Sequence, residues 1–416
     1  MEYMSAAVRA LTKEGVRFPN PGSVTIGPEV NLDRISGEGV VIHPGCRIAG
    51  DKTLIMGGAE VGEEAPATVK DCRLGPDVKL KGGFYDGAVF LRGASMGYGA
   101  HVRSGTILEE EACGAHTVGL KQTILLPFVT LGSLINFCDI LMAGGTSRKD
   151  HSEVGSSFIH FNYTPNQDKA TPSLMGDVPR GVMLDRPPIF LGGQGGLVGP
   201  CRLAFGTVTA AGSITRKDEA RPDRLIVAPG MRGGSFPFKA GAYGNIRRIV
   251  HHNLNYIANL TALMAWYRHV RGIFVGPDLS PELHEGLVET LSAAIGERIK
   301  RLKGLSDKVA GGLGQAAPAS ATAGSFTSQQ EEFVGMWPRL EERLLEVSSR
   351  EGDGEMRDAF LAALSADRDS RKAVTYLETI KALNENTKAA GTGWLDGVVE
   401  HVMGETLSLL PSFKGD

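Results

Sequence analysis

Between positions 191 and 214 the chain repeats apolar and small residues with a period of six, as LGGQGG, LVGPCR, LAFGTV and TAAGSI. The four blocks open on Leu191, Leu197, Leu203 and Thr209. Neither a helix, with 3.6 residues per turn, nor a strand, with a period of two, gives this spacing. A left-handed parallel β-helix does, because each flat side of its triangular coil takes one hexapeptide whose opening residue faces the core. The pattern therefore predicts that these four residues point inward.

Weaker hexapeptides precede this run from about position 24. They open on Ile26, Ile42, Val61, Leu74, Met96 and Val102. The register is interrupted around 82–90 and 122–134, where we expect loops to leave the coils. A longer aperiodic stretch over 143–186 is the place where a binding loop is expected. We predict an N-terminal helix or cap over 1–23 and a β-helix over 24–243.

After about position 245 glycine becomes rare and apolar residues take helical spacing. Helices are predicted over 245–275, 281–302, 331–347, 354–364, 370–386 and 394–410. An Ala/Gly/Ser/Thr tract over 310–329 is typical of a flexible linker. The predicted fold is therefore mainly β, a left-handed parallel β-helix solenoid followed by an all-α C-terminal region over 244–416.

Composition and net charge limit the cellular compartments and the classes of binding partner that are expected for the chain. The net charge of −3 gives no electrostatic case for binding nucleic acid or an anionic membrane. Five cysteines without a CxxC pair argue against a disulfide framework or a zinc ribbon. The chain has no apolar run long enough for a signal peptide or a membrane span. We expect a cytoplasmic protein.

The aperiodic stretch holds the densest set of reactive side chains. His151 follows Arg148 and Lys149 in a polar segment, and histidine titrates near neutral pH, as a general base must. The two cations, with Lys169 further on, are suited to phosphate. Each of these residues could equally be a solvated surface side chain. Three histidines, His116, His151 and His160, do not have the spacing of a three-His zinc site, and no metal is predicted.

A series of motifs over 135–215 adds a resemblance. It runs through Asn136-Phe137, Lys149-Asp150-His151, Phe161-Asn162-Tyr163 with Lys169, LVGP and TAAGS. In this order it resembles the acetyltransferase half of the bacterial bifunctional glucosamine-1-phosphate acetyltransferase/N-acetylglucosamine-1-phosphate uridylyltransferase family. That family's N-terminal nucleotide-binding signature is absent, and LMAGGTSRK at 141–149 resembles it only faintly.

The resemblance implies acetyl transfer from acetyl-CoA to an amino-sugar phosphate, at a site between the subunits of a homotrimer. It gives His151 the role of base and makes Asn162 and Tyr163 contacts to substrate. Arg148, Lys149 and Lys169 would meet phosphate. Backbone groups at Gly193 and Ala211 would line the cofactor groove.

Two differences from the motifs of that family leave other interpretations of the site and the function open. The interval from His151 to Asn162 is shorter than in the family, which makes His160 the alternative base. The family has serine where this chain has Gly193. The alternative function is a non-catalytic solenoid that binds a sugar nucleotide or scaffolds a partner. A nucleotidyltransferase, related to UDP-N-acetylglucosamine pyrophosphorylase, comes third.

Overall fold

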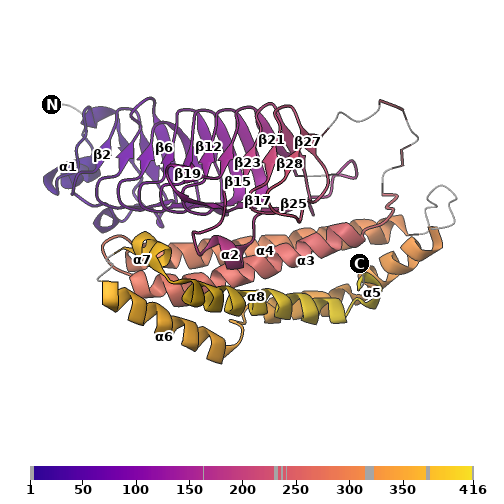
Figure 1. The fold of residues 1–416 in the computed structure, drawn as a ribbon. Coiled ribbons are helices and arrows are strands. Elements are labelled where there is room, and N and C mark those ends of the chain that lie inside the picture. The colour runs from indigo at the N-terminus through magenta and orange to yellow at the C-terminus, as the bar shows by residue number, and fades with distance from the viewer. Residues whose placement is uncertain are drawn as a thin grey trace.

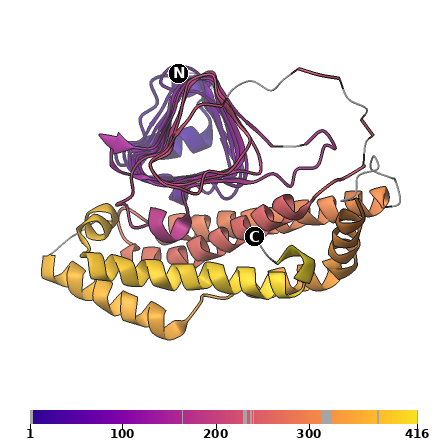
Figure 2. The ribbon, with the colours of Figure 1, turned by 45° about the vertical axis from the view of Figure 1, so that its right-hand side comes forward.

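The computed structural model describes residues 4–162, 164–228, 233–235, 238–239, 241–313, 323–371 and 375–414. Its N-terminal part is a parallel β-solenoid, and its C-terminal part is a layer of helices that runs along one side of it (Figure 1). Seen closer to the solenoid axis, the coils stack into a triangular outline (Figure 2). The predicted fold class is confirmed.

The described strands form three parallel faces that the chain visits in turn. Face one contains β1 (Thr25–Ile26), β3 (Arg47–Ala49), β6 (Ala67–Lys70), β9 (Gly83–Asp86), β12 (Ala100–Val102), β15 (Val118–Leu125), β17 (Ile135–Met142), β21 (Phe158–Phe161), β24 (Gly196–Val198) and β27 (Ile214–Thr215). Face two contains β4 (Leu54–Ile55), β7 (Arg73–Leu74), β10 (Ala88–Phe90), β13 (Thr106–Leu108), β22 (Ser173–Met175) and β25 (Arg202–Leu203). Face three contains β2 (Val41–Ile42), β5 (Glu60–Val61), β8 (Lys79–Leu80), β11 (Ser95–Met96), β14 (Cys113–Gly114), β16 (Thr130–Leu131), β20 (Glu153–Val154), β23 (Phe190–Leu191), β26 (Val208–Thr209) and β28 (Leu225–Ile226). The long strands β15 and β17 turn a corner and join faces one and two.

The hexapeptide pattern produces this register. Three hexapeptides make one coil, so Gly196 pairs with Ile214, 18 positions later. The opening residues Leu191, Leu197, Leu203 and Thr209 are all buried in the solenoid, as the pattern predicts. Stacking of equivalent residues on successive coils builds one continuous core.

The two shorter interruptions are not loops, and that prediction is wrong. The segment 82–90 holds β9 and β10, and β15 continues through Gln122. Gln122 has a φ of 50°, so a left-handed turn at a single polar residue bends the strand around the corner. The pattern failed here because such a turn breaks the hexapeptide register without leaving the coil.

The longer interruption over 143–186 does carry insertions. A hairpin of β18 (Gly145–Ser147) and β19 (Asp150–His151) leaves the corner between faces two and three. A four-residue helix, α2 (Val178–Gly181), leaves the same corner one coil later, where Asp177 caps it through the Arg180 amide. Strands β20, β21 and β22 meanwhile continue the solenoid.

Helices cap the solenoid and cover one face. They are α1 (Ala6–Lys13) at the N-terminal end, then α3 (Arg247–Ala265), α4 (Pro281–Gly312), α5 (Ala323–Val347), α6 (Gly354–Arg371), α7 (Tyr376–Ala382) and α8 (Glu385–Ser408). Short 3-10 turns lie at Pro21–Ser23, Leu32–Arg34, Arg271–Phe274 and Pro411–Phe413, and a π-helical turn lies at Trp266–Val270. The linker expected over 310–329 is helical at both ends, since α4 reaches Gly312 and α5 begins at Ala323. Positions 314–322 of that tract lie outside the described residues.

Helix α4 runs along face two from coil to coil. Ser280 caps its N-terminus by accepting a hydrogen bond from the Leu283 amide. Further along, Glu289 pairs with Arg73 of β7 (2.8 Å), Arg298 pairs with Asp139 of β17, and Lys308 donates to the Asn166 carbonyl (2.8 Å). The helix is therefore tied to the solenoid at three levels along its length.

Helix α3 lies between the solenoid and the outer helices and is buried on nearly every side. Its interior asparagines bond to the solenoid backbone. Asn253 donates to the Ala170 carbonyl (2.9 Å), and Asn259 accepts from the Val178 amide (2.9 Å). Polar side chains thus fix how the helices dock. No helix in the described ranges is long and apolar enough to cross a membrane.

Candidate functional site

The hairpin β18–β19 positions three of the side chains that the sequence singled out. Gly144 and Gly145 start it with φ values of 104° and 97°, a conformation that suits glycine. Arg148 folds back from its tip, and its Nη1 donates to the Phe128 carbonyl (2.8 Å) and to Thr130 Oγ1 (2.9 Å). The guanidinium therefore fastens the hairpin to neighbouring coils while its charge meets no carboxylate on the described chain.

His151 ends the same hairpin, with its side chain 19% exposed. Its Nδ1 lies 3.0 Å from the Arg148 carbonyl oxygen. A carbonyl can only accept, so Nδ1 carries the proton and donates, and the lone pair of the neutral ring is on Nε2. Glu153 Oε2 lies 3.8 Å from Nε2, close enough to stabilise the charged ring. The ring is thus held in the tautomer that a base requires.

Asn162 and Lys169 lie at another corner, between faces one and two. Asn162 Nδ2 donates to Asp139 Oδ2 (3.1 Å), and Asp139 in turn pairs with Arg298 of α4. The Lys169 side chain is exposed, and its carbonyl lies 3.5 Å from Arg298 Nη1. Tyr163 lies outside the described residues. Asn162 therefore takes part in the contact between the solenoid and the helices.

His160, the alternative base, is buried in the solenoid. Its Nδ1 donates to the Cys138 carbonyl, and its Nε2 accepts from Ser173 Oγ (2.8 Å). Burial lowers the pKa of this imidazole to about 4. Both ring nitrogens are used inside the protein, so His160 offers no nitrogen to a substrate.

Gly193 and Ala211 lie at the third corner, between faces three and one, on adjacent coils. The Gly193 carbonyl accepts from the Gly212 amide (2.9 Å), so the two turns stack directly. A Cβ on Gly193 would lie 2.7 Å from the Ser156 carbonyl oxygen, which leaves no room for a side chain. The predicted base, the Asn162 group and the glycine turns thus occupy three different corners, and one chain does not bring them together.

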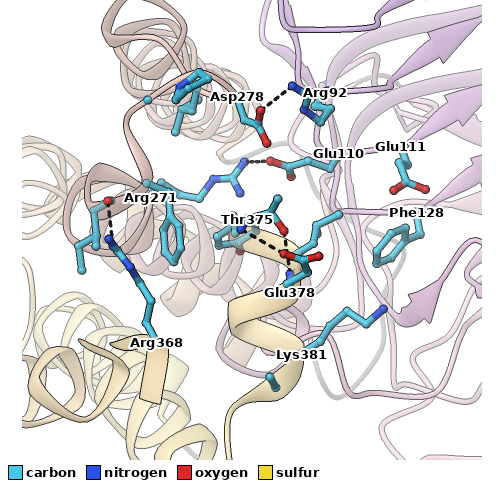
Figure 3. A pocket seen from close by; sticks show the side chains of 18 of the residues that line it. Arg92, Glu110, Glu111, Phe128, Arg271, Asp278, Arg368, Thr375, Glu378 and Lys381 are labelled. Atoms are coloured by element: carbon cyan, nitrogen blue, oxygen red, sulfur yellow. Dashed lines mark hydrogen bonds and ion pairs between the residues drawn. The ribbon is translucent and has the colours of Figure 1, made fainter. Parts of the chain in front are cut away.

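A cavity of 1140 Å³ opens between the solenoid and the helices beside the hairpin. Its solenoid wall includes Arg92, Glu110, Phe128, Arg148 and Lys149. Its opposite wall comes from 271–279, Arg368 of α6, Thr375 and α7 (Figure 3). Two of the predicted phosphate contacts, Arg148 and Lys149, therefore line a cavity that the C-terminal helices complete.

Buried charges form one side of this cavity. Arg271 Nη2 donates to Glu110 Oε1 (2.5 Å), and the guanidinium carbon lies 3.7 Å from the centre of the Tyr376 ring (Figure 3). Behind this pair, the Tyr267 hydroxyl donates to Glu109 Oε1 (2.7 Å). Burial raises the pKa of Glu109, although nearby Arg271 acts in the opposite direction.

The sequence did not identify Arg271, Arg368 or Lys381 as parts of a site. They come from three helical segments, more than 160 positions after Arg92 on the opposite wall. No local motif links such residues, and only the docking of the helices brings them together. The one available signal was an arginine next to the apolar stripe of a helix predicted over 245–275.

About half of the chain is similar to known proteins. The chain is 26% identical over 212 residues to the bifunctional protein GlmU of Fervidobacterium nodosum, which is 50% of this chain and 40% of that protein. The chain is similar to GlmU. Two further GlmU proteins, from Nocardia farcinica and Thermotoga petrophila, are 27% identical over 218 residues and 26% over 215. The resemblance inferred from the motifs is confirmed.

The match to GlmU is partial on both sides. It covers 52% of this chain and 39% of the Nocardia farcinica GlmU, and 51% and 42% for Thermotoga petrophila. The chain thus spans about two-fifths of the length of these relatives. No protein-family model matches it. Within the described ranges, no three histidine, cysteine, aspartate or glutamate side chains are grouped as metal ligands.

Proposed function

We propose that the chain is an N-acetyltransferase that moves the acetyl group of acetyl-CoA to an amino-sugar phosphate such as glucosamine-1-phosphate, in the cytoplasm. The observation that carries the proposal is the orientation of His151, whose Nδ1 is occupied by the Arg148 carbonyl and whose Nε2 can accept a proton. The likeness to GlmU supports the same class of reaction.

The chemistry assigns one step to the histidine. The substrate amine attacks the thioester carbonyl, and His151 Nε2 takes the proton that the amine loses. The tetrahedral intermediate then collapses, the carbon–sulfur bond breaks, and the coenzyme A thiolate leaves and takes up a proton. Glu153 stabilises the imidazolium formed in between. Lys149 and Lys169 would bind the sugar phosphate, with Arg148 holding the hairpin that carries the base.

The separation of the three corners favours a site shared between subunits. In a homotrimer of parallel solenoids, one corner of each chain faces a different corner of its neighbour. The turns at Gly193 and Ala211 would then supply backbone amides to acetyl-CoA beside the hairpin of the next chain. Asn162 and Tyr163 would complete substrate binding. We propose this trimer as the active form.

The test is release of free thiol from acetyl-CoA with glucosamine-1-phosphate and a panel of amino sugars. Wild-type protein should release thiol only when an amine is present. His151→Asn should lower kcat by about 100-fold or more, because general base catalysis contributes about that much. His401→Asn, a partly exposed histidine on helix α8, is the matched control and should change kcat less than about twofold. Equal activity of His151→Asn and wild type would refute the base assignment.

A second function is favoured by the distribution of the candidate residues. Since no corner of one chain holds a complete set, the solenoid could bind a sugar nucleotide without transferring anything. This alternative predicts ligand-dependent thermal stabilisation with no thiol release from any amine. A nucleotidyltransferase would instead release pyrophosphate from UTP.

A further inference from the structure

The cavity beside the hairpin contains a buried cation with free hydrogen-bonding groups. The Arg271 side chain is 1% exposed. Its Nη2 is bound to Glu110, but its Nε and Nη1 have no partner among the described residues. A buried donor without an acceptor costs about 1–3 kcal/mol, and more on a charged group, so such groups are rarely left empty. Arg271 therefore holds two hydrogen-bond donors beside the cavity that no acceptor of the described chain satisfies.

Further cations surround the opening. Arg148 and Lys149 stand on the solenoid wall, and Arg368 and Lys381 on the helical wall. None of these four forms an ion pair with a carboxylate of the described chain, whereas Arg92 of the same wall is bound to both Asp77 and Asp278. Glu110, Glu111, Asp278 and Glu378 also line the cavity, so its six basic side chains exceed the acidic ones by two, and the basic side chains stand on both walls.

The cations of the helical wall rest on aromatic rings. Arg368 lies with its guanidinium carbon 5.7 Å from the centre of the Phe274 ring, and Lys381 Nζ lies 5.7 Å from the centre of the Phe128 ring. Such contacts orient a cation without neutralising it. The charged groups are therefore positioned but remain available to an anion.

Part of the wall is apolar. It is formed by Phe128, Ile273, Phe274, Val275, Pro277 and Leu377. An inorganic ion would leave this surface uncovered. At 1140 Å³ the cavity is as large as those that enclose whole organic ligands, which are about 300–1,000 Å³. Its size and its mixed walls fit a molecule with both a phosphate end and an uncharged, partly apolar end.

We propose that this cavity binds an organic diphosphate of nucleotide size. The phosphates lie between Arg271 and the two cations of the helical wall, Arg368 and Lys381, and the uncharged part lies against Phe274 and its apolar neighbours. Arginine's planar donor groups match phosphate oxygens and supply the acceptor that Arg271 lacks. The site is built by helices α6 and α7 and does not depend on acetyl transfer at His151.

The test is isothermal titration of the full chain without acetyl-CoA, using uridine diphosphate, uridine, pyrophosphate and glucosamine-1-phosphate as separate probes. Uridine diphosphate should bind tightest, and its affinity should fall as salt is raised, because the contacts are ionic. Tightest binding of glucosamine-1-phosphate would reassign the site to a sugar monophosphate and overturn the proposal. Equal binding of pyrophosphate, or of uridine, would also overturn it.

Variants locate the binding. Arg368→Met and Lys381→Met each remove a cation that has no ion pair to lose, and each should weaken uridine diphosphate about tenfold, the usual effect of one charge-assisted contact. Lys300→Met, an exposed lysine on α4 outside the cavity, is the matched control and should not change the affinity. Unchanged binding in both cavity variants, or no binding by wild type at millimolar ligand, would refute the proposal.

Discussion

Arg298 of α4 and Asp139 of β17 form an ion pair, 2.7 Å between Nη2 and Oδ1, that lies almost entirely out of solvent where the helices meet the solenoid. The second oxygen of Asp139 accepts from Asn162. Both charges have given up hydration, so each depends on the other. This pair is the most deeply buried of the contacts that hold α4 against face two.

Removing one partner should be costly. Arg298→Met leaves the Asp139 carboxylate buried without its counter-charge, and we expect it to lower the free energy of unfolding by about 3–5 kcal/mol. Urea unfolding at pH 7 measures this loss. Arg301→Met, which breaks only an intrahelical pair with Glu297 on the same helix, should cost about 0.5 kcal/mol.

A double variant separates lost charge from lost packing. Arg298→Met combined with Asp139→Asn removes both charges and should recover part of the stability lost in Arg298→Met. If the double variant is less stable than the single variant by the full cost of a second mutation, the two side chains do not interact as described.

The buried His160 should make the protein sensitive to mild acid. Its pKa is about 4 in the folded protein against 6.5 for a free histidine, so the unfolded chain takes up a proton between those values that the folded chain refuses. Stability is therefore lost as pH falls from 6.5 toward 4, by about 2 kcal/mol between pH 7.5 and 5. Unfolding free energies at several pH values should show a shallower decline for His160→Gln than for wild type. Parallel curves would contradict this account.

Glu109 should make the protein less stable as pH rises, which is the opposite of the pH dependence expected from His160. Burial raises its pKa above the ordinary 4.5, so the carboxyl stabilises the fold when protonated and that stability is lost as pH rises above 4.5. Glu109→Gln keeps an oxygen for the Tyr267 hydroxyl and cannot ionise. We expect it to be more stable than wild type at pH 8 by more than about 1 kcal/mol, with a smaller difference at pH 5.

The control for Glu109 is its neighbour on the same turn. Glu111→Gln lies at a partly exposed position and should change the free energy of unfolding by less than about 0.5 kcal/mol at both pH values. A Glu109→Gln variant whose advantage does not grow with pH would show that the carboxyl is already ionised in the folded protein.

Two glycines of the solenoid should respond differently to the same substitution. Gly83 and Gly212 both have positive φ, 128° and 74°. A Cβ on Gly83 would lie 2.2 Å from the Ala100 carbonyl oxygen, whereas one on Gly212 meets nothing within 4 Å. Gly212→Ala should cost about 1 kcal/mol from backbone strain, and Gly83→Ala about 3 kcal/mol or more. Thermal unfolding of the two variants checks the difference.

Most of the fold that could be predicted from the sequence was predicted from the hexapeptide pattern. It placed Leu191 and Leu197 in the core because the coil repeats at a fixed interval, and local spacing is sufficient to see that. It failed at Gln122, where one residue in a left-handed conformation turns a corner that the rule reads as a break. The helices followed from their own periodicity, but their docking on face two did not.

The candidate site likewise contains residues whose roles the sequence could predict and residues whose roles it could not. His151 could be proposed from its polar neighbours in sequence, and its hydrogen bond to Arg148 is local. The role of Asn162 as a partner of Asp139 and Arg298 depends on a helix 136 positions later, which no motif in the loop reveals. The cavity around Arg271 was out of reach for the same reason.

Solenoids generally gain and lose repeats with ease, because each coil contacts only its neighbours. Here helix α4 lies along the stack of coils and contacts it at fixed positions. Its Glu289, Arg298 and Lys308 side chains bind Arg73, Asp139 and the Asn166 carbonyl respectively. Inserting or deleting one coil between those levels would shift every later solenoid partner by about 4.8 Å relative to its side chain on α4. The number of coils between these contacts is therefore constrained by the length of helix α4, whose rise per residue is fixed.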